Sequence, residues 1–334
     1  MTESRYFVVT DHPNGVPDEA LFELCTDSLP ELASGQLKLK NLWLSVDPYM
    51  RNRMDGVKTY IDPFELNAPM EGAAIGEVVE SSDERFTVGD KVRHMAGWRD
   101  HAVVDANHVE PLPSYDVPLQ AYLGVLGMPG MTAWTGLNTI AGLTGEDTVL
   151  VSAASGAVGF LAVQLAVQKG CTVVGTAGSK EKCQWLESLG VHAVNHHQSA
   201  EDIAAGIKRA APQGIDVYFE NVGGPMLDAA LASMNDFGRI AVCGMISRYN
   251  DGEQPGPANI AMMLTKRLRV QGFIVLEHWE GYSDFIKDVG PLVQKGVIEY
   301  QESVFEGLEA TPKAFLSLFE SGAYNGKRLV KLAP

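Results

Sequence analysis

A turn of small residues between two apolar runs is the first place where this chain could do chemistry. The run Thr148–Val151 leads into Ala153–Gly159, and apolar residues then recur at helical spacing. Gly156 would let the backbone approach a phosphate closely, and Gly159 would let the helix lie tight on the strand, with its N-terminus facing the phosphates. We therefore expect this strand, turn and helix to bind the pyrophosphate of a dinucleotide, although Ala154 replaces the first glycine of the usual motif. A βαβ unit without a ligand is the alternative. The expected phosphate contacts are Ser155, Gly156, Ala157, Val158 and Gly159.

The end of the next apolar run indicates which dinucleotide would bind. In NAD-binding units an acidic residue about 20 residues beyond the glycine turn holds the ribose 2′-hydroxyl. Here the run Thr172–Gly175 leads to Gly178, Ser179 and Lys182, with no acid at the expected strand end. A hydroxyl and an ammonium group suit a 2′-phosphate, so the sequence predicts NADP(H). The alternative is that Lys182 only faces solvent at the start of a helix.

Alternating strand and helix patterns from Leu119 onward predict the scaffold that holds this turn. The expected strands lie at 148–151, 172–175, 193–195, 215–219, 239–243 and 268–275. Strands interleaved with helices in this way predict a doubly wound parallel sheet of the α/β class. Ligands bind such sheets beyond the carboxyl ends of the strands.

Residues 1 to about 120 have a different pattern, with short β-like runs separated by turn signals. This pattern predicts a small, mostly β, barrel-like domain. A late strand-like piece, a helix and a final strand suggest that the chain returns to that domain. We therefore expect a substrate domain at 1–122 and 298–334, and a dinucleotide-binding domain at 123–297.

Composition narrows the class of partner. The 334 residues carry a net charge of -16, and such an acidic surface repels phosphate backbones, so no nucleic-acid partner is expected. No apolar run reaches the roughly 18 residues of a membrane span, and the first residues lack the apolar core of a signal peptide. Four cysteines without paired spacing predict reduced thiols and a cytoplasmic protein.

Several ordered motifs resemble one family across nearly the whole chain. Residues 47–51, Asp-Pro-Tyr-Met-Arg, are similar to a signature of the zinc-independent medium-chain dehydrogenases/reductases. That family includes leukotriene B4 12-hydroxydehydrogenases, prostaglandin reductases, plant double-bond reductases and curcumin reductases. Segments 127–132, 153–159, 220–224 and 238–249 also match. The resemblance implies a GroES-like β-barrel domain with a Rossmann domain, NADPH as cofactor, often a homodimer, and reduction of α,β-unsaturated carbonyl compounds.

The residue types also argue against a metal. Zinc alcohol dehydrogenases of the wider superfamily carry a Gly-His-Glu motif and a cluster of four cysteines. The comparable segment here, Pro69–Gly72, has Met70 in place of the ligand histidine, and the cysteines are scattered. His196 and His197 are adjacent, and neighbours on a strand point to opposite faces, so the pair would chelate poorly. We expect no metal site.

The resemblance assigns roles to individual residues. Tyr249 corresponds to the family tyrosine at the nicotinamide ribose, which is the candidate acid; alternatively it only covers the cofactor. Tyr49 resembles the tyrosine that lines the substrate pocket, or is a packed aromatic. Thr132 either hydrogen-bonds the nicotinamide or caps a helix. Further implied cofactor contacts are Asn221, Cys243, Gly244, Met245, Ile246, Phe273, Ile274 and Val275. A buried sheet strand is the plain alternative for residues 273–275.

Two positions depart from the family pattern. His196 stands where the family often has a tyrosine near the adenine ribose. Tyr324 aligns with the family asparagine near the C-terminus, and Asn325 follows it. We include His196 and Asn325 among the expected cofactor contacts.

These expectations combine into one reaction. An enone or 2-alkenal would accept hydride from NADPH at its β-carbon, with Tyr249 or the cofactor ribose stabilising the enolate and water protonating the α-carbon. Two alternatives stay open. One is an NADPH quinone reductase of the same superfamily, and the other is a catalytically silent NADPH-binding protein.

Overall fold

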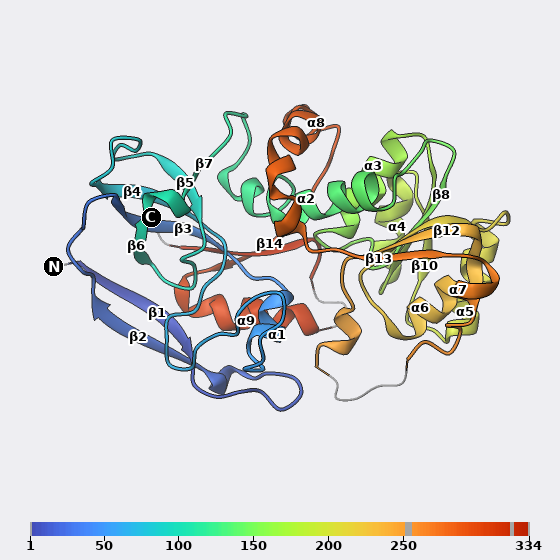
Figure 1. Ribbon diagram of the computed structural model, residues 1–334, viewed down its shortest axis with the longest axis horizontal. Helices are drawn as coiled ribbons and strands as arrows, with labels where there is room; N and C mark the ends of the chain where they lie inside the picture. The colour runs from blue at the N-terminus through green and yellow to red at the C-terminus, as the bar shows by residue number, and fades with distance from the viewer. Residues whose placement is uncertain (1, 251–255, 321–323, 333–334) are drawn as a thin grey trace. The chain divides into compact units, whose positions relative to one another are not determined.

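The computed structural model describes residues 2–250, 256–320 and 324–332, and it divides into two compact units (Figure 1). One unit comprises residues 1–124 and 302–334, and the other comprises residues 125–301. Within the described residues, no helix is long and apolar enough to cross a membrane.

The first unit is built mainly from antiparallel strands. Its larger sheet has the order β14-β15-β3-β4-β5-β7, with β6 paired to β3, and a separate hairpin pairs β1 with β2. Inward residues alternate along β3, so that Leu37, Leu39 and Asn41 are buried between less buried neighbours. The strands are β1 (Glu3–Val9), β2 (Phe22–Ser28), β3 (Gln36–Ser45), β4 (Ala74–Ser81), β5 (Lys91–His94), β6 (His101–Asp105), β7 (Glu110–Pro111), β14 (Glu302–Glu306) and β15 (Lys327–Lys331). The helices are α1 (Tyr49–Arg53) and α9 (Thr311–Leu316).

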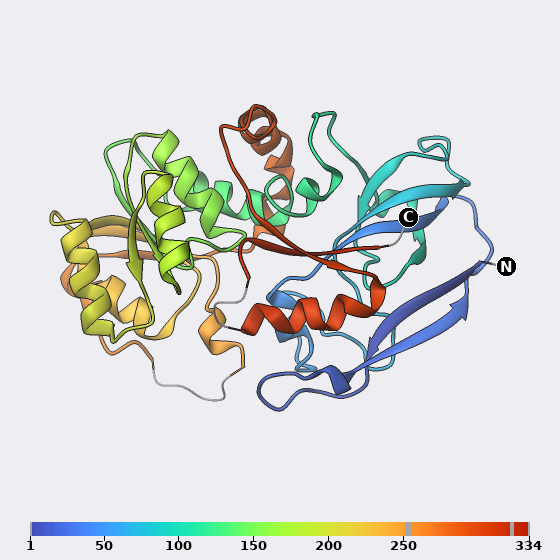
Figure 2. The same ribbon diagram turned by 180° about the vertical axis from the view of Figure 1, so that it is seen from behind.

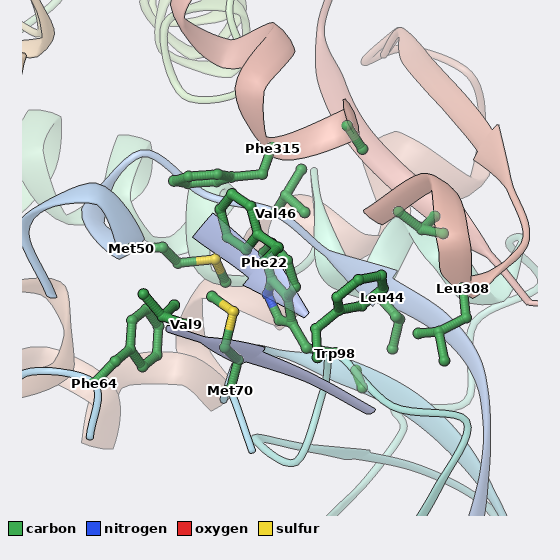
Figure 3. Close-up of a cluster of buried hydrophobic side chains, with 14 of the residues drawn as sticks. Val9, Phe22, Leu44, Val46, Met50, Phe64, Met70, Trp98, Leu308 and Phe315 are labelled. Carbon is green, nitrogen blue, oxygen red and sulfur yellow. The ribbon is translucent and has the colours of Figure 1, made fainter. Parts of the chain in front are cut away.

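An aromatic cluster joins the two chain segments of this unit (Figure 3). The rings of Phe22 and Trp98 stack with centroids 5.5 Å apart, and Phe315 of α9 lies edge-on at 6.0 and 5.9 Å from them. Each aromatic buries roughly 150–250 Å², which is the main stabilising term in such a core. The C-terminal segment is therefore part of the core formed by residues before 125.

The second unit contains a six-stranded parallel sheet among its described residues, with the order β10-β9-β8-β11-β12-β13. Residues of α5 and α6 pack on one face, against Leu150, Val174 and Tyr218, and α3 covers the opposite face (Figures 1 and 2). The strands are β8 (Thr148–Val151), β9 (Thr172–Ala177), β10 (His192–Asn195), β11 (Ile215–Glu220), β12 (Met234–Val242) and β13 (Arg269–Gly272). The helices are α2 (Met128–Thr135), α3 (Gly159–Gln168), α4 (Lys180–Ser188), α5 (Ala200–Ala210), α6 (Gly224–Ser233), α7 (Met262–Thr265) and α8 (Tyr282–Gln294). The predicted doubly wound sheet is confirmed.

Local residues explain where the helices begin. Ser179 caps α4 by accepting the Lys182 amide at 3.2 Å, and Ser199 caps α5 by accepting the Asp202 amide at 3.2 Å. Each helix follows a strand after a short turn, so the caps fix where the loops beyond the sheet turn back.

The last strand of this sheet corrects one expectation. The strand predicted for 268–275 covers only Arg269–Gly272, and each of its residues is exposed rather than buried. Phe273 and Ile274 follow the strand, and Val275 begins a 3-10 turn. The alternative of a buried strand at residues 273–275 was wrong because β13 ends at Gly272; among the described residues β13 pairs with β12 alone and forms the edge of the sheet.

Candidate functional site

The glycine turn follows β8 at the carboxyl edge of the parallel sheet. Ala153 takes the left-handed conformation with φ 47°, which turns the chain sharply after the strand. A Cβ on Gly159 would lie 2.4 Å from the Ala153 carbonyl oxygen and 2.9 Å from the Ala154 Cα. Only glycine fits there, and its absence of a side chain lets α3 start directly against the turn.

The start of α3 provides the chemistry that phosphates need. The first amides of a helix have no partner within it, and the helix dipole places positive potential there. Ser155, Gly156, Ala157 and Val158 are half-buried small or apolar residues, whereas Gly159 is buried. A Cβ on Gly156 would meet the Ala153 carbonyl oxygen at 3.2 Å. These residues fit the close approach of a pyrophosphate.

A second group of site residues lies at the end of β9, next to the end of β10. Gly178 follows β9, Ser179 caps α4, and Lys182 is half-buried in its first turn. His196 follows β10 and donates its amide to the Ala177 carbonyl at 3.1 Å. Its half-buried ring interacts with Lys182. Four predicted residues are therefore neighbours, and the group contains hydroxyl, ammonium and imidazole functions suited to an anion.

Sequence reasoning missed a buried network that holds Asn221. The Ser152 hydroxyl donates to the Glu220 carboxylate at 3.0 Å and accepts the Asn221 amide at 2.8 Å. The Asn221 side-chain amide donates to the Ser152 carbonyl at 2.7 Å. Glu220 also accepts the amides of Val222 and Gly223, at 2.6 and 3.1 Å. An acidic residue that ends the apolar run 215–219 was the available signal.

Burial has an electrostatic consequence for this network. Desolvation raises the pKa of Glu220 above its usual value, although its backbone and hydroxyl donors act in the opposite direction. Removing the carboxylate would leave buried donors without an acceptor. We infer that Glu220 shapes the loop that carries Asn221.

The loop after β12 is bound to the loop after β11. The amides of Cys243 and Gly244 donate to the Glu220 carbonyl, and the Ile246 amide donates to the Asn221 carbonyl at 3.1 Å. Tyr249 ends the 3-10 turn Ile246–Arg248, and a Cβ on Gly244 would lie 3.0 Å from its hydroxyl oxygen. The Tyr249 hydroxyl is therefore folded back over the end of β12, beside the segment that contains Met245.

Cys243 is not a thiolate nucleophile in this environment. Burial, with a smaller contribution from Glu220, raises the pKa of its thiol to about 12. The thiol stays protonated at neutral pH, so the residue offers an apolar surface to a bound ligand.

The structure also places the predicted residues outside these loops. The Thr132 hydroxyl donates to the Met128 carbonyl at 2.7 Å within α2, whose N-cap is Gly127. The capping role considered for Thr132 was therefore wrong. Phe273 packs against Phe219 at a centroid distance of 6.4 Å, and a Cβ on Gly136 would lie 2.9 Å from its ring.

Tyr49 and Asn325 belong to the other unit. Tyr49 starts α1 and packs partly buried against the aromatic core, and burial raises the pKa of its phenol. It is therefore a neutral hydrogen-bond donor at neutral pH. Asn325 is exposed, and its carbonyl accepts the Ser303 hydroxyl at 2.9 Å.

The His, Cys, Asp and Glu side chains of the described residues do not form a group that could bind a metal ion. Among residues 2–250, 256–320 and 324–332, no three His, Cys, Asp or Glu side chains converge. Met70 is buried in the core, and Glu71 is paired with Arg53 at 2.8 Å. The His94 ring is bound to Asn41 at 2.8 Å, and burial lowers its pKa to about 3.

One expectation about the histidines was wrong. β10 ends at Asn195, so His196 and His197 lie in the following turn rather than on the strand. Their rings do not point to opposite faces but touch, with centroids 4.8 Å apart.

Comparison with known proteins supports a relationship over the whole chain. Residues 5–112 match the family described as the N-terminal domain of oxidoreductase, and residues 157–290 match the family described as zinc-binding dehydrogenase. The chain is 37% identical to CurA from Vibrio vulnificus, solved in complex with NADPH, with a TM-score of 0.92 and 99% of each chain covered.

Curated relatives have similar length. A 2-alkenal reductase (NADP(+)-dependent) of Nicotiana tabacum is 41% identical over 99% of this chain and 98% of its own length. Prostaglandin reductase 1 of Rattus norvegicus is 39% identical, covering 99% of this chain and 100% of its own. The NADPH-dependent curcumin reductase of Escherichia coli strain K12 is 38% identical, covering 99% and 97%. The chain belongs to the zinc-independent medium-chain dehydrogenase/reductase family that contains these reductases.

Proposed function

We propose that this protein uses NADPH to reduce the C=C bond of enones and 2-alkenals. The observation that carries the proposal is the full-length identity of 41% to an NADP(+)-dependent 2-alkenal reductase. The prostaglandin and curcumin reductases among its relatives support the same reaction class. We assign substrate binding to the unit of residues 1–124 and 302–334, and cofactor binding to residues 125–301.

The cofactor site follows from the loops at the sheet edge. Residues 155–159 would hold the pyrophosphate, because glycine and the start of α3 leave room and amides for it. Ser179, Lys182 and His196 would hold the 2′-phosphate. The nicotinamide end would lie against Thr132 of α2 and against residues of the remaining loops of this unit, namely Asn221, Cys243, Gly244, Met245, Ile246, Phe273, Ile274 and Val275.

Bound NADPH supplies the hydride that forms the new C–H bond at the β-carbon. The π pair of the C=C bond then forms the bond between the α-carbon and the carbonyl carbon, the carbonyl π pair moves to oxygen, and the Tyr249 phenol donates a hydrogen bond to that enolate oxygen. Tyr49, a neutral phenol beside the core, lines the substrate pocket. Solvent then protonates the α-carbon. The side chains position the reactants, and no step requires a metal.

The assay follows NADPH absorbance with a 2-alkenal, a long-chain enone and a quinone in parallel. Consumption with the alkenal or enone, and a product saturated at the C=C bond, would support the proposal. Turnover of the quinone alone would favour a quinone reductase. NADPH binding without turnover of any acceptor would favour a silent cofactor-binding protein.

Replacing Tyr249 with phenylalanine should lower kcat for the enone by about tenfold to a hundredfold, because the enolate loses a hydrogen-bond donor. NADPH affinity should change little, since the ring remains. Tyr6→Phe is the matched control, because the Tyr6 hydroxyl is bound to Asp27 on the β1–β2 hairpin. An unchanged kcat for Tyr249→Phe would assign the donor to the cofactor ribose or to water.

The exposed edge strand supports a proposed homodimer. β13 has exposed residues throughout, and no strand among the described residues pairs with its outer edge, which is a surface that a second copy can cover. We expect a sedimentation mass of twice 36.1 kDa. Val270→Lys on β13 should weaken the dimer, whereas Val88→Lys, at a residue 68% exposed in the other unit, should not. A monomeric wild-type protein would contradict this arrangement.

The proposed cytoplasmic location rests on the cysteines. All four are free thiols, which suits a reducing compartment.

A further inference from the structure

His196 and His197 form a pair of imidazoles beside the proposed 2′-phosphate site. Their ring centroids are 4.8 Å apart, with 73° between the ring planes. A Cβ on Gly178 would lie 2.7 Å from His197 Nε2 and 3.1 Å from His196 Nε2. Both Nε2 atoms therefore converge on the glycine that separates β9 from the cap of α4.

The surroundings of the pair favour an anion. Burial is the main cause that lowers the pKa of His196, to about 4, and the neighbouring His197 and Lys182 act in the same direction. Glu181 is hydrogen-bonded to Ser179 and to its own amide, and Asp202 accepts the Ser199 hydroxyl at 2.8 Å. The groups that act on His196 are thus an imidazole and an ammonium group, and the acids at the starts of α4 and α5 are engaged with their own caps.

His196 also has an unused polar atom. Its Nδ1 is buried and has no hydrogen-bond partner within the described part of the chain. His197 is exposed, and its amide is held by the Asn195 side chain at 2.9 Å. One ring is therefore positioned inside the site and the other at its rim, where solvent can deliver a proton.

We propose that His196 and His197 take up a proton when the 2′-phosphate of NADPH binds, so that the preference for NADPH over NADH strengthens as the pH falls. This inference rests on the proposed NADPH function and adds His197 to its specificity-determining residues. A dianion offsets the cost of placing a charge beside Lys182, and histidine is the side chain that gains a proton between about pH 8 and about pH 6. NADH lacks the 2′-phosphate, so its binding should not be coupled to this proton uptake.

The test compares dissociation constants for NADPH and NADH, from fluorescence titration at about pH 6, 7 and 8. In the wild type, the dissociation constant for NADH divided by that for NADPH should fall about tenfold from the lowest pH to the highest. Linkage to the uptake of one proton over part of this pH range gives a change of that size. The variant His196→Gln/His197→Gln should lose this fall. The second ionisation of the phosphate, near about pH 6, is common to both proteins. His192→Gln, at an exposed histidine of β10, is the matched control and should behave as the wild type.

Calorimetry of NADPH binding in two buffers of different ionisation enthalpy gives a second readout. Proton uptake should be measurable in the wild type and absent in the double variant, and circular dichroism checks that the variant is folded. Identical selectivity profiles for the wild type and the double variant would overturn this inference while leaving the NADPH function intact. Equal affinity of the wild type for NADPH and NADH at every pH would overturn the cofactor assignment itself.

Discussion

Gly159→Ala should abolish measurable NADPH binding and lower the midpoint of thermal unfolding by roughly 5 °C. The added Cβ would lie 2.4 Å from the Ala153 carbonyl oxygen and 2.9 Å from the Ala154 Cα. Both are backbone atoms, which cannot rotate away as a side chain can. The turn and the start of α3 must therefore separate, and the amides that face the phosphates are displaced.

Two other glycines separate the effect on binding from the effect on folding. Gly156→Ala meets only the Ala153 carbonyl oxygen, at 3.2 Å, so stability should change little while the phosphates lose their close approach. Gly256→Ala meets nothing within 4 Å and should change neither property. NADPH titration of the three variants measures the effect on binding, and thermal unfolding measures the effect on stability. Wild-type affinity in Gly159→Ala would mean that the cofactor does not use this turn.

The parallel sheet was predictable because its signals are local. Apolar runs bounded by glycine, and helices with apolar residues at regular spacing, lie within about 20 residues of each other. The strand order β10-β9-β8-β11-β12-β13 is the usual 3-2-1-4-5-6 order of doubly wound dinucleotide-binding sheets. The glycine turn was predictable for the same reason, since the need for glycine there is set by the local backbone.

The wrong predictions concern residues whose exposure and orientation are set by packing and not by the local sequence pattern. The alternative of a buried strand at residues 273–275 was wrong because the strand ends at Gly272, and the exposure of β13 follows from its position at the sheet edge. The two histidines were treated as strand residues although the predicted run at 193–195 ends before them, and in the turn after β10 their rings are in contact. Residues just beyond a strand are placed by the turn and not by the alternation of the strand, and here the turn brings two imidazole rings together.

Long-range polar contacts also could not be predicted from the sequence. The bond between Ser152 and Glu220 joins residues 68 positions apart, and neither type is diagnostic alone. The same holds for Lys327, which is bound to Asp47 from the opposite end of the chain. Such pairs require the fold before they can be recognised.

The Lys327–Asp47 pair provides the second large expected effect. Lys327 Nζ donates to the Asp47 carboxylate at 2.6 Å and to the Val46 carbonyl at 2.7 Å. The side chains of the two ionic partners are only 5% and 6% exposed. Lys327→Met should lower the free energy of unfolding by about 3–5 kcal/mol, because it leaves a buried carboxylate without its counter-charge.

Denaturant unfolding of a small set of variants tests this reasoning. Lys287→Met removes an ion pair whose partners are 71% and 68% exposed, so it should cost no more than about 1 kcal/mol. The double variant Asp47→Asn/Lys327→Met should recover part of the loss, since an amide carries no charge to desolvate. A loss for Lys327→Met as small as that for Lys287→Met would show that the buried carboxylate is neutralised in another way.

Lys327→Met should also change the kinetics, because Asp47 lies two residues before Tyr49. A displaced Tyr49 would weaken substrate binding, so KM for the enone should rise more than kcat falls.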